Sequence, residues 1–388
     1  MSEPLYGTPQ PKHAPLGPLA PLLDRSSTAA QADAEALRAL GAAERSGDFY
    51  QRLGHRNGRS FEALVAELEG AEGAVSFASG MGAMSAALAA HLSQGDRVLV
   101  AQEIYGGTAA FATQDLLRFG VEVDRFSSLD LSSLREQLAR PAKMVVFESP
   151  INPTLRVADI SALAAAARDA GACAVFDGTF SPPPIHRVLE LGVDLVVHSA
   201  TKFFGGHSDV LAGVVAGRHE HLGPIEAWRR RTGGLLAPDA AWLLQRSWPT
   251  LGLRVQAQQD NALALAQGLQ ELVRSGTLTA VTYPGLDDHP DREVVARQMN
   301  GGGAVLSFEM PGGLPAVLAA LDRLQVIARG ASLGGVETLA TVPAYTTHAP
   351  LSPAERAAAG ISDGLMRVAV GLEPVEELLA DLRQAIRA

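Results

Sequence analysis

Short apolar runs alternate with helical stretches through the middle of the chain, and this alternation limits the possible folds more than any other feature. Seven such runs recur: Ala74–Ala78, Arg97–Ala101, Val121–Phe126, Met144–Glu148, Cys173–Asp177, Asp194–His198 and Leu211–Ala216. Helix-forming segments lie between several of them: Met84–Leu92, Phe111–Phe119 and Ser161–Ala170. Because strands that alternate with helices form largely parallel sheets covered on both faces, the sequence predicts an α/β fold.

The pattern changes after Pro238. A long helical stretch, broken near Pro249, is followed by strand-like segments mixed with helices: 278–283, 303–309, 366–370 and the closing helix 374–388. The first 45 residues are rich in Pro and Ala without a periodic pattern, which is typical of an arm. We therefore predict an N-terminal arm (1–60), a sheet domain (61–247) and a smaller C-terminal α+β domain (248–388).

Composition excludes several classes of protein. The 388 residues are 47% hydrophobic, which is ample for a large core, and the net charge of −10 argues against a nucleic-acid-binding protein. The single cysteine, Cys173, allows no internal disulfide and no cysteine-based zinc site, which suits the reducing cytoplasm. We expect no bound metal, because His219-x-His221 lies in polar, surface-like sequence. We also expect no signal peptide and no membrane span.

Polar and glycine residues follow several of the predicted strands. They are Ser79-Gly80-Met81, Tyr105-Gly106-Gly107-Thr108, Glu148-Ser149-Pro150-Ile151-Asn152-Pro153, Asp177 and Ser199-Ala200-Thr201-Lys202. Ligands of open parallel sheets bind beyond the carboxyl ends of the strands. These segments should therefore converge on one active site.

Lysine is scarce, so each lysine is informative. Lys12 lies in the arm and Lys143 precedes a strand, whereas Lys202 follows an apolar strand and precedes Phe203-Phe204. A lysine on a loop is usually a surface residue. A partly buried lysine, however, has a lowered pKa and can form a Schiff base with an aldehyde. We interpret Lys202 as the reactive residue.

Asp177 and the Ser79–Gly82 turn also permit two interpretations each. Asp177 could cap a turn, or it could pair with the protonated ring nitrogen of a pyridine cofactor. The turn precedes an Ala-rich helix, whose free amides suit a phosphate, and Ser199 and Thr201 could add hydroxyl donors or serve only their own turn. The spacing Gly80-x-Gly82-x-x-Ser85 also nearly matches a dinucleotide-binding fingerprint, which is weak evidence by itself.

Tyr105 and Arg367 complete the candidate set. A tyrosine after a strand is often a core residue, but the two glycines after Tyr105 would let it lie flat on a planar cofactor. Arg367 interrupts the apolar stretch Leu365–Val370. It could point outward from a strand, or it could bind a substrate carboxylate with its forked guanidinium group.

With these residues in place, the chain resembles the Cys/Met-metabolism (trans-sulfuration) family of pyridoxal-phosphate enzymes from about residue 48 onward. Matching segments occur in family order: Tyr50-Gln51-Arg52, Leu68-Glu69-Gly70, Ser79-Gly80-Met81, Tyr105-Gly106-Gly107-Thr108, Glu148-Ser149-Pro150-Ile151-Asn152-Pro153, Asp177-Gly178-Thr179-Phe180, His198-Ser199-Ala200-Thr201-Lys202, Gly206-His207-Ser208-Asp209, Tyr283-Pro284-Gly285-Leu286 and Ser332-Leu333-Gly334-Gly335. The resemblance implies the aspartate aminotransferase-type fold (fold type I), with a mostly parallel seven-stranded sheet.

The resemblance also implies a role for each site residue. Lys202 would bind pyridoxal 5'-phosphate covalently and move protons, Asp177 would keep the pyridine nitrogen protonated, and Tyr105 would stack on the ring. The phosphate would be bound by Gly80, Met81, Ser199, Thr201 and, from a neighbouring subunit, Tyr50 and Arg52. Arg367, Asn152 and Ser332 would bind the substrate carboxylate. The arm would contact the neighbouring subunit in a homo-oligomer, expected to be a dimer of dimers.

Departures from the family pattern bear on the substrate. Members that use cystathionine commonly have Arg at the position of Ala110 and Glu at that of Ala331. Methionine γ-lyases usually have Cys where this chain has Gly107. The usual Asn-Pro-Thr is replaced by His55-Arg56-Asn57, so Arg56 or Arg59 could contact substrate, or the change could be neutral.

We therefore predict a carbon–sulfur lyase that acts by γ-elimination on cystathionine or methionine-like substrates, giving a 2-oxo acid, ammonia and a thiol. The main alternative is γ-replacement, as in cystathionine γ-synthase or O-acyl-homoserine sulfhydrylase. A β-lyase and a dinucleotide-binding module are further alternatives.

Overall fold

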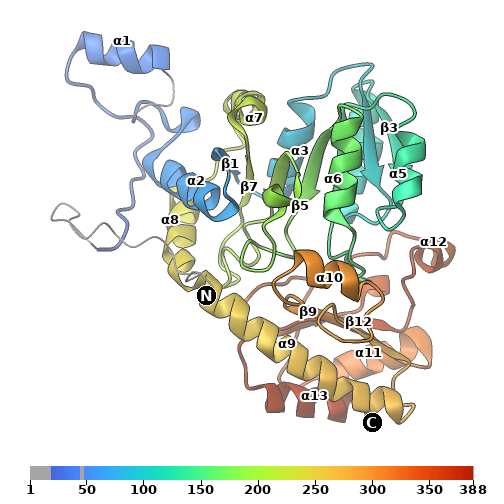
Figure 1. The fold of residues 1–388 in the computed structure, drawn as a ribbon. Helices are drawn as coiled ribbons and strands as arrows, with labels where there is room; N and C mark the ends of the chain where they lie inside the picture. The colour runs from blue at the N-terminus through green and yellow to red at the C-terminus, as the bar shows by residue number, and fades with distance from the viewer. Residues whose placement is uncertain (1–18, 44–47, 388) are drawn as a thin grey trace.

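The computed structural model describes residues 19–43 and 48–387. Predictions for residues 1–18, 44–47 and Ala388 lie outside the described residues. Two sheets stand one above the other in Figure 1, and the long helix α9 runs beside the lower one. Within the described ranges no helix is long and apolar enough to cross a bilayer, and no group of His, Cys, Asp and Glu is placed to hold a metal ion.

The larger sheet has seven strands in the order β1-β7-β6-β5-β4-β2-β3. Their bounds are β1 Gly73–Phe77, β2 Arg97–Ala101, β3 Glu122–Phe126, β4 Met144–Glu148, β5 Cys173–Asp177, β6 Leu195–His198 and β7 Gly213–Gly217. The five strands from β6 to β3 pair in parallel, whereas β7 is antiparallel to both of its neighbours. This confirms the mostly parallel seven-stranded sheet. It also places the carboxyl ends of β1, β2, β4, β5 and β6 at one edge.

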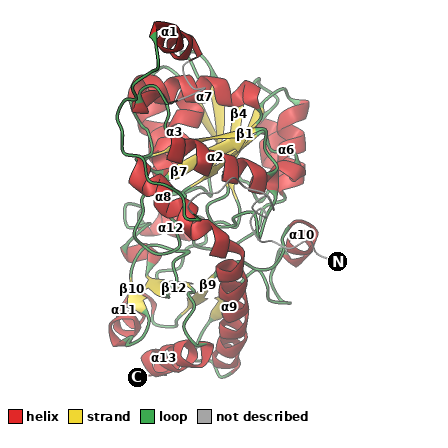
Figure 2. Cartoon of the chain, turned by 90° about the vertical axis from the view of Figure 1, so that its left-hand side faces the viewer, coloured by secondary structure: helices red, strands yellow, loops and turns green. Residues whose placement is uncertain are grey.

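Helices cover both faces of this sheet, and Figure 2 shows its strands between α3 and α6. Bounds of the surrounding helices are α2 Arg56–Glu69, α3 Gly80–Ala89, α4 Gly106–Ala110, α5 Leu131–Gln137, α6 Ile160–Asp169 and α7 His219–Thr232. Helix α3 begins earlier than predicted because the Ser79 side chain caps it, accepting a hydrogen bond from the Gly82 amide. The segment Phe111–Phe119 is helical as predicted, and it continues α4 with π-helical geometry over Phe111–Leu116.

The C-terminal part contains a five-stranded sheet in the order β10-β11-β12-β9-β8. Its strands are β8 Ala280–Thr282, β9 Val305–Glu309, β10 Ala328–Arg329, β11 Leu339–Thr341 and β12 Leu365–Ala369. The helices of this part are α9 Leu251–Arg274, α10 Arg292–Gln298, α11 Gly313–Arg323, α12 Pro353–Ala358 and α13 Val375–Arg387. Helix α8 (Pro238–Ser247) precedes them and packs in the apolar cluster of the large sheet. A 3-10 turn, Trp248–Thr250, separates α8 from α9, at the break predicted near Pro249.

Apolar side chains form two buried clusters, one on each sheet. The larger includes Phe77, Phe147 and Phe176, and the smaller includes Leu269 and Phe308. Side chains from residues 295–305 also join the larger cluster, because the loop before β9 returns to it. The domain boundaries at residues 60/61 and 247/248 stay predictions.

The arm contains one helix that the sequence pattern did not predict. Helix α1 (Ala34–Ala43) extends away from the body of the molecule in Figure 1. Its start is capped by Asp33, whose carboxylate accepts a hydrogen bond from the Ala36 amide at 2.8 Å. Nearer the body, Trp242 Nε1 donates to the Pro21 carbonyl at 2.6 Å, which attaches the arm to α8.

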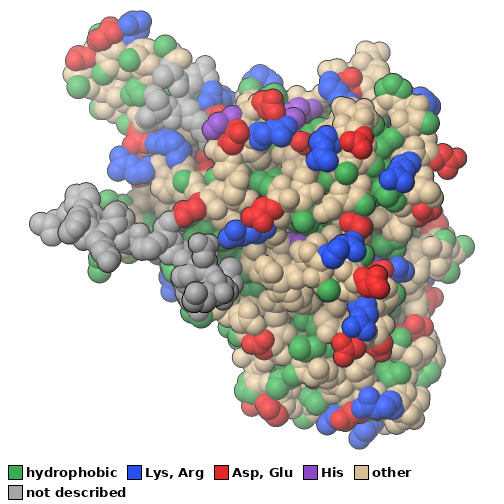
Figure 3. All heavy atoms as spheres, in the orientation of Figure 1, with side chains coloured by type: hydrophobic (Ala, Val, Ile, Leu, Met, Phe, Trp, Pro, Cys, Tyr) green, Lys and Arg blue, Asp and Glu red, His purple; other side chains and the backbone are tan. Residues whose placement is uncertain are grey.

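Charged side chains of both signs are interspersed over the face shown in Figure 3.

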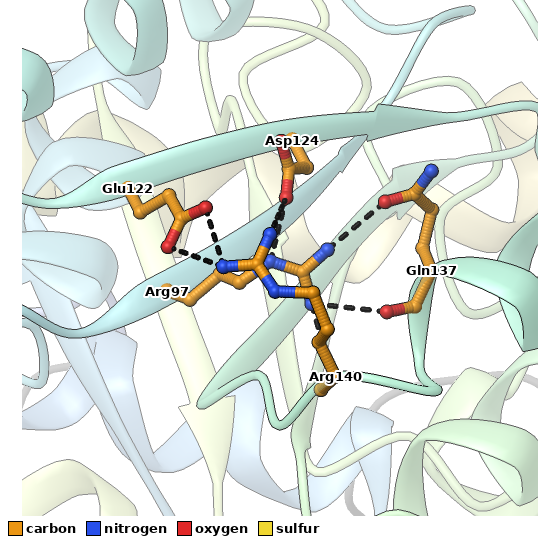
Figure 4. Close-up of polar contacts among 5 residues, drawn as sticks. All are labelled: Arg97, Glu122, Asp124, Gln137 and Arg140. Carbon is orange, nitrogen blue, oxygen red and sulfur yellow. Dashed lines mark hydrogen bonds and ion pairs between the residues drawn. The ribbon is translucent and has the colours of Figure 1, made fainter.

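One buried charged group stabilises the edge of the large sheet. Arg97 is 6% exposed, and its guanidinium binds Asp124 on β3 at 2.6 Å and the carbonyls of Gln137 and Arg140 at 3.0 Å each (Figure 4). Arg140 forms an exposed ion pair with Glu122 at 2.7 Å and lies 3.6 Å from Asp124.

We expect Arg97→Met to lower the free energy of unfolding by about 2–4 kcal/mol, because it leaves two carbonyls without their donor and Asp124 with only the more distant Arg140. Chemical denaturation measured by circular dichroism tests this. Arg140→Met is the matched control and should leave the midpoint nearly unchanged, since exposed ion pairs contribute little. Equal losses in the two variants would contradict this account of the edge.

Candidate active site

A cavity of about 270 Å³ lies at the carboxyl ends of the parallel strands. Nine of the predicted site residues line it: Gly80, Met81, Tyr105, Asn152, Asp177, Ser199, Thr201, Lys202 and Arg367. Ser332 lies beside them, because its hydroxyl accepts a hydrogen bond from Lys202 Nζ at 2.9 Å. Residues up to 287 positions apart in the chain thus meet at one edge of the sheet.

The first turn of α3 forms one wall. Amides at the start of a helix have no acceptor within it, so those of Gly80 and Met81 remain available to an anion. Gly80 packs against Ser199, since a Cβ at Gly80 would lie 2.7 Å from the Ser199 Cβ. Only glycine therefore lets these amides and the Ser199 hydroxyl approach one ligand.

Thr201 forms its hydroxyl contacts with Ala212. Its hydroxyl donates to the Ala212 carbonyl at 3.1 Å and accepts from the Ala212 amide at 3.0 Å. Its own amide also donates to that carbonyl. Because the hydroxyl proton is already used, Thr201 shapes the cavity wall here, and its phosphate contact stays a prediction.

Lys202 follows β6 and extends into the cavity. Burial, together with the nearby positive charge of Arg367, lowers the pKa of its amine. A lowered pKa increases the fraction of neutral amine, which is the form that attacks an aldehyde. The other lysine that the structure describes, Lys143, forms a surface ion pair with Asp96 at 2.7 Å.

Asp177 ends β5 and presents its carboxyl group to the same cavity. One oxygen accepts a hydrogen bond from the Thr179 amide at 3.0 Å, as expected of a turn cap. Burial raises the pKa of this carboxyl. Within the described residues no Lys or Arg forms an ion pair with it, so both interpretations of Asp177 fit: it caps the turn and remains available to a cationic ring nitrogen.

Arg367 lies on β12 and is 3% exposed, which excludes the outward-facing interpretation. Its Nη1 donates to Asn152 Oδ1 at 2.9 Å, and its Nη2 donates to the Ser332 carbonyl at 3.0 Å. Nε is buried without an acceptor in the described part of the chain. Burial lowers the pKa of Arg367 to about 10, so it remains charged at neutral pH.

Tyr105 also lines the cavity, and the sequence interpretation missed Glu148, whose carboxylate binds the Tyr105 amide. The Tyr105 amide donates to Glu148 Oε2 at 2.7 Å, and the Asn152 amide donates to Glu148 Oε1 at 3.2 Å. The sequence did contain a sign of this role, because Glu148 is an acidic residue at the end of an apolar strand, in the same position as Asp177. Gly107 packs closely against this half-exposed ring, since a Cβ would lie 2.6 Å from it unless the ring moved.

Tyr50 and Arg52 do not line the cavity of their own chain. Tyr50 is 44% exposed, and Arg52 lies over its ring and donates to the Arg230 carbonyl at 2.6 Å. The unusual segment that follows serves local structure. His55 caps α2 by accepting from the Gly58 amide, while Arg56 and Arg59 both pair with Asp48.

Comparison with known proteins gives one consistent answer. A family model described as "Cys/Met metabolism PLP-dependent enzyme" matches residues 8–387. The chain belongs to this family. It is therefore related to enzymes that use pyridoxal phosphate (PLP) in sulfur amino-acid metabolism, and the expected family and fold are confirmed.

Individual members of the PLP family differ in activity. The chain is 39% identical to an L-methionine gamma-lyase of Pseudomonas putida, over 96% of this chain and 93% of that protein. It is 40% identical to an O-succinylhomoserine sulfhydrylase of Pseudomonas aeruginosa, over 89% and 85%. A solved cystathionine gamma-lyase, CalE6 of Micromonospora echinospora, superposes with a TM-score of 0.89 at 33% identity, over 97% and 96%.

The cavity suits PLP chemically. An anion site at the start of α3, an amine with a lowered pKa and a buried carboxyl without a cationic partner correspond to the phosphate, the aldehyde and the pyridine nitrogen of the cofactor. When bound, PLP withdraws electrons from the substrate Cα. Lys202, Asp177, Gly80 and Met81 are the residues that would hold it.

Proposed function

We propose that this protein is a γ-lyase that cleaves the carbon–sulfur bond of L-methionine and similar uncharged thioether amino acids. The balanced reaction is methionine plus water to 2-oxobutanoate, ammonia and methanethiol. Lys202, Arg367 and the cofactor contacts would perform the common steps of the family. The choice of substrate rests on the rest of the cavity.

This proposal rests on the side chains that line the rest of the cavity, apart from the charged residues assigned above, because these side chains are mostly apolar. Besides Tyr105, four described lining residues are ionisable: Glu148, Asp177, Lys202 and Arg367. The others include Met84, Leu211, Ala331 and Leu333. Cystathionine carries a second ammonium and carboxylate at its distal end, and among the described residues of this chain no further charged side chain lines the cavity to pair with them. A methylthio group would instead gain from burial.

Each polar residue has a defined task in this reaction. Arg367, held by Asn152 and Ser332, would bind the substrate carboxylate and fix its orientation. The Lys202 amine would then take the proton from Cα and return protons to later carbon positions. Asp177 would keep the ring nitrogen protonated, and Tyr105 would cover the ring.

A comparison of kcat/KM for L-methionine and L-cystathionine tests the substrate. We expect L-methionine to be preferred by at least about tenfold, since unpaired buried polar groups discriminate strongly. Preference for cystathionine would overturn the assignment. Activity with an O-acyl-homoserine plus sulfide, without release of a 2-oxo acid from L-methionine, would instead establish γ-replacement.

The exposed position of Tyr50 and Arg52 supports a site completed by a neighbouring subunit. We propose a homo-oligomer, a dimer of dimers, in the cytoplasm, in which Arg52 binds the cofactor phosphate of the adjacent chain. Arg52→Ala should raise the PLP dissociation constant at least about tenfold, because charge-assisted contacts to phosphate are strong. Arg38→Ala, in the arm, is the control. Unchanged affinity on titration with PLP would remove the shared-site proposal.

A further inference from the structure

Glu148 is a buried carboxyl group to which the proposed reaction gives no task. It is the last residue of β4 and lies opposite Asp177 in the β4–β5 ladder. Both residues line the cavity, and Glu148 is only 5% exposed. Because paired positions on neighbouring strands present their side chains to the same face, the two carboxyl groups lie side by side.

Each oxygen of Glu148 binds a different loop of the active site. Oε2 accepts from the Tyr105 amide at 2.7 Å, and Oε1 accepts from the Asn152 amide at 3.2 Å. The Asn152 side chain in turn accepts from Arg367 Nη1. One carboxyl group therefore connects the residue proposed to cover the ring with the pair proposed to bind the substrate carboxylate.

Among the described residues, no Lys or Arg forms an ion pair with Glu148. Asp177 lies beside it on β5, Glu103 acts on it from the segment after β2, and Lys202 and Arg367 also face the cavity. His198 acts on Asp177 from β6. Burial and the Asp177 charge raise the pKa of Glu148 to about 8. A protonated ring nitrogen at Asp177 would supply the missing positive charge.

We propose that Glu148 is a positioning residue, which holds Tyr105 and the Asn152–Arg367 pair in one arrangement and whose negative charge is stabilised by the ring nitrogen that Asp177 binds. This inference rests on the proposed roles of Tyr105, Asn152 and Asp177. The proposal adds a coupling between the cofactor site and the substrate site. Binding of the cofactor ionises Glu148, and the ionised Glu148 positions the Asn152–Arg367 pair that binds the substrate carboxylate.

Glu148→Gln tests this proposal because it keeps the size of the side chain but removes its charge and one acceptor. The readout is the dissociation constant of PLP from pH 6.5 to 9. The wild-type Glu148 carboxyl becomes increasingly ionised across this range, so binding of the cationic ring should gain most at its upper end. We expect the variant-to-wild-type ratio of dissociation constants to rise at least threefold over this range. A ratio independent of pH would overturn the proposal.

Turnover gives a second, independent readout. Glu148→Gln should reduce kcat/KM for L-methionine at least tenfold, and adding Asn152→Ala should cost less than the product of the two single losses, because both act through Arg367. Strictly multiplicative losses would contradict the coupling. If wild-type protein does not turn over L-methionine, the proposed function fails, while the PLP titration still decides the role of Glu148.

Glu62→Gln is the matched control. Glu62 is a buried carboxylate on α2 that pairs with Arg229 at 2.7 Å and does not line the cavity. Its variant should lower the thermal midpoint without changing the pH dependence of PLP binding. A merely structural role for Glu148 would give the same pattern as this control, which would overturn the proposal.

Discussion

Lys202→Ala should abolish covalent attachment of PLP and reduce turnover of L-methionine by at least about 10³-fold. The variant removes both the amine that binds the aldehyde and the group that would move protons at Cα, and each contributes on the order of 10²–10⁴-fold. Borohydride reduction of the loaded wild-type protein, followed by peptide mass mapping, should place the pyridoxyl group on Lys202.

The scarcity of lysine makes this experiment decisive. The chain has only two others, Lys12 and Lys143, and Lys143 is tied to Asp96 at the surface. Lys143→Ala is therefore the control and should retain attachment and turnover. Circular dichroism should show that both variants are folded. Attachment to either of the other lysines, or turnover that survives in Lys202→Ala, would contradict the assignment.

Arg367→Leu should raise KM for L-methionine by roughly 30-fold to several thousand-fold. Removing one partner of a buried, hydrogen-bonded charge pair costs about 2–5 kcal/mol, and each 1.4 kcal/mol is a factor of ten. The loss should fall mainly on KM, because the carboxylate is bound both before and during the reaction. Steady-state kinetics with L-methionine measures it.

A substrate analogue separates this role from a structural one. 3-(Methylthio)propylamine is methionine without its carboxylate, so its inhibition constant should be nearly the same for wild type and Arg367→Leu. Affinity for PLP should also be retained, since Arg367 is not proposed to hold the cofactor. Equal weakening of L-methionine and the amine would show that the variant disrupts the cavity as a whole.

Much of the fold could be predicted from local sequence. The runs at residues 97–101, 144–148 and 173–177 are strands with those bounds, because a strand buried on both faces reads as a continuous apolar run. The reversed direction of β7 could not be predicted this way. Its orientation follows from the loop between β6 and β7 and from pairing with β1, more than 130 residues earlier in the chain.

The candidate site was predictable where unusual residues follow strands, as Lys202 and Asp177 do. Two features of the site could not be predicted in this way. Glu148 ends its strand in the same way, but its importance comes from two backbone amides that only the folded loops bring to it. Thr201 has the residue type of a phosphate ligand, yet its hydroxyl is used by Ala212, a tertiary contact with no local signature.

The central claim is γ-elimination from an uncharged thioether amino acid, and the most direct measurement is the identity of the products formed from L-methionine. Purified, PLP-loaded protein should release 2-oxobutanoate, methanethiol and ammonia in equal amounts, as detected by mass spectrometry and a thiol assay. No 2-oxo acid from L-methionine, together with pyruvate from L-cystathionine, would contradict the claim and identify a β-lyase instead.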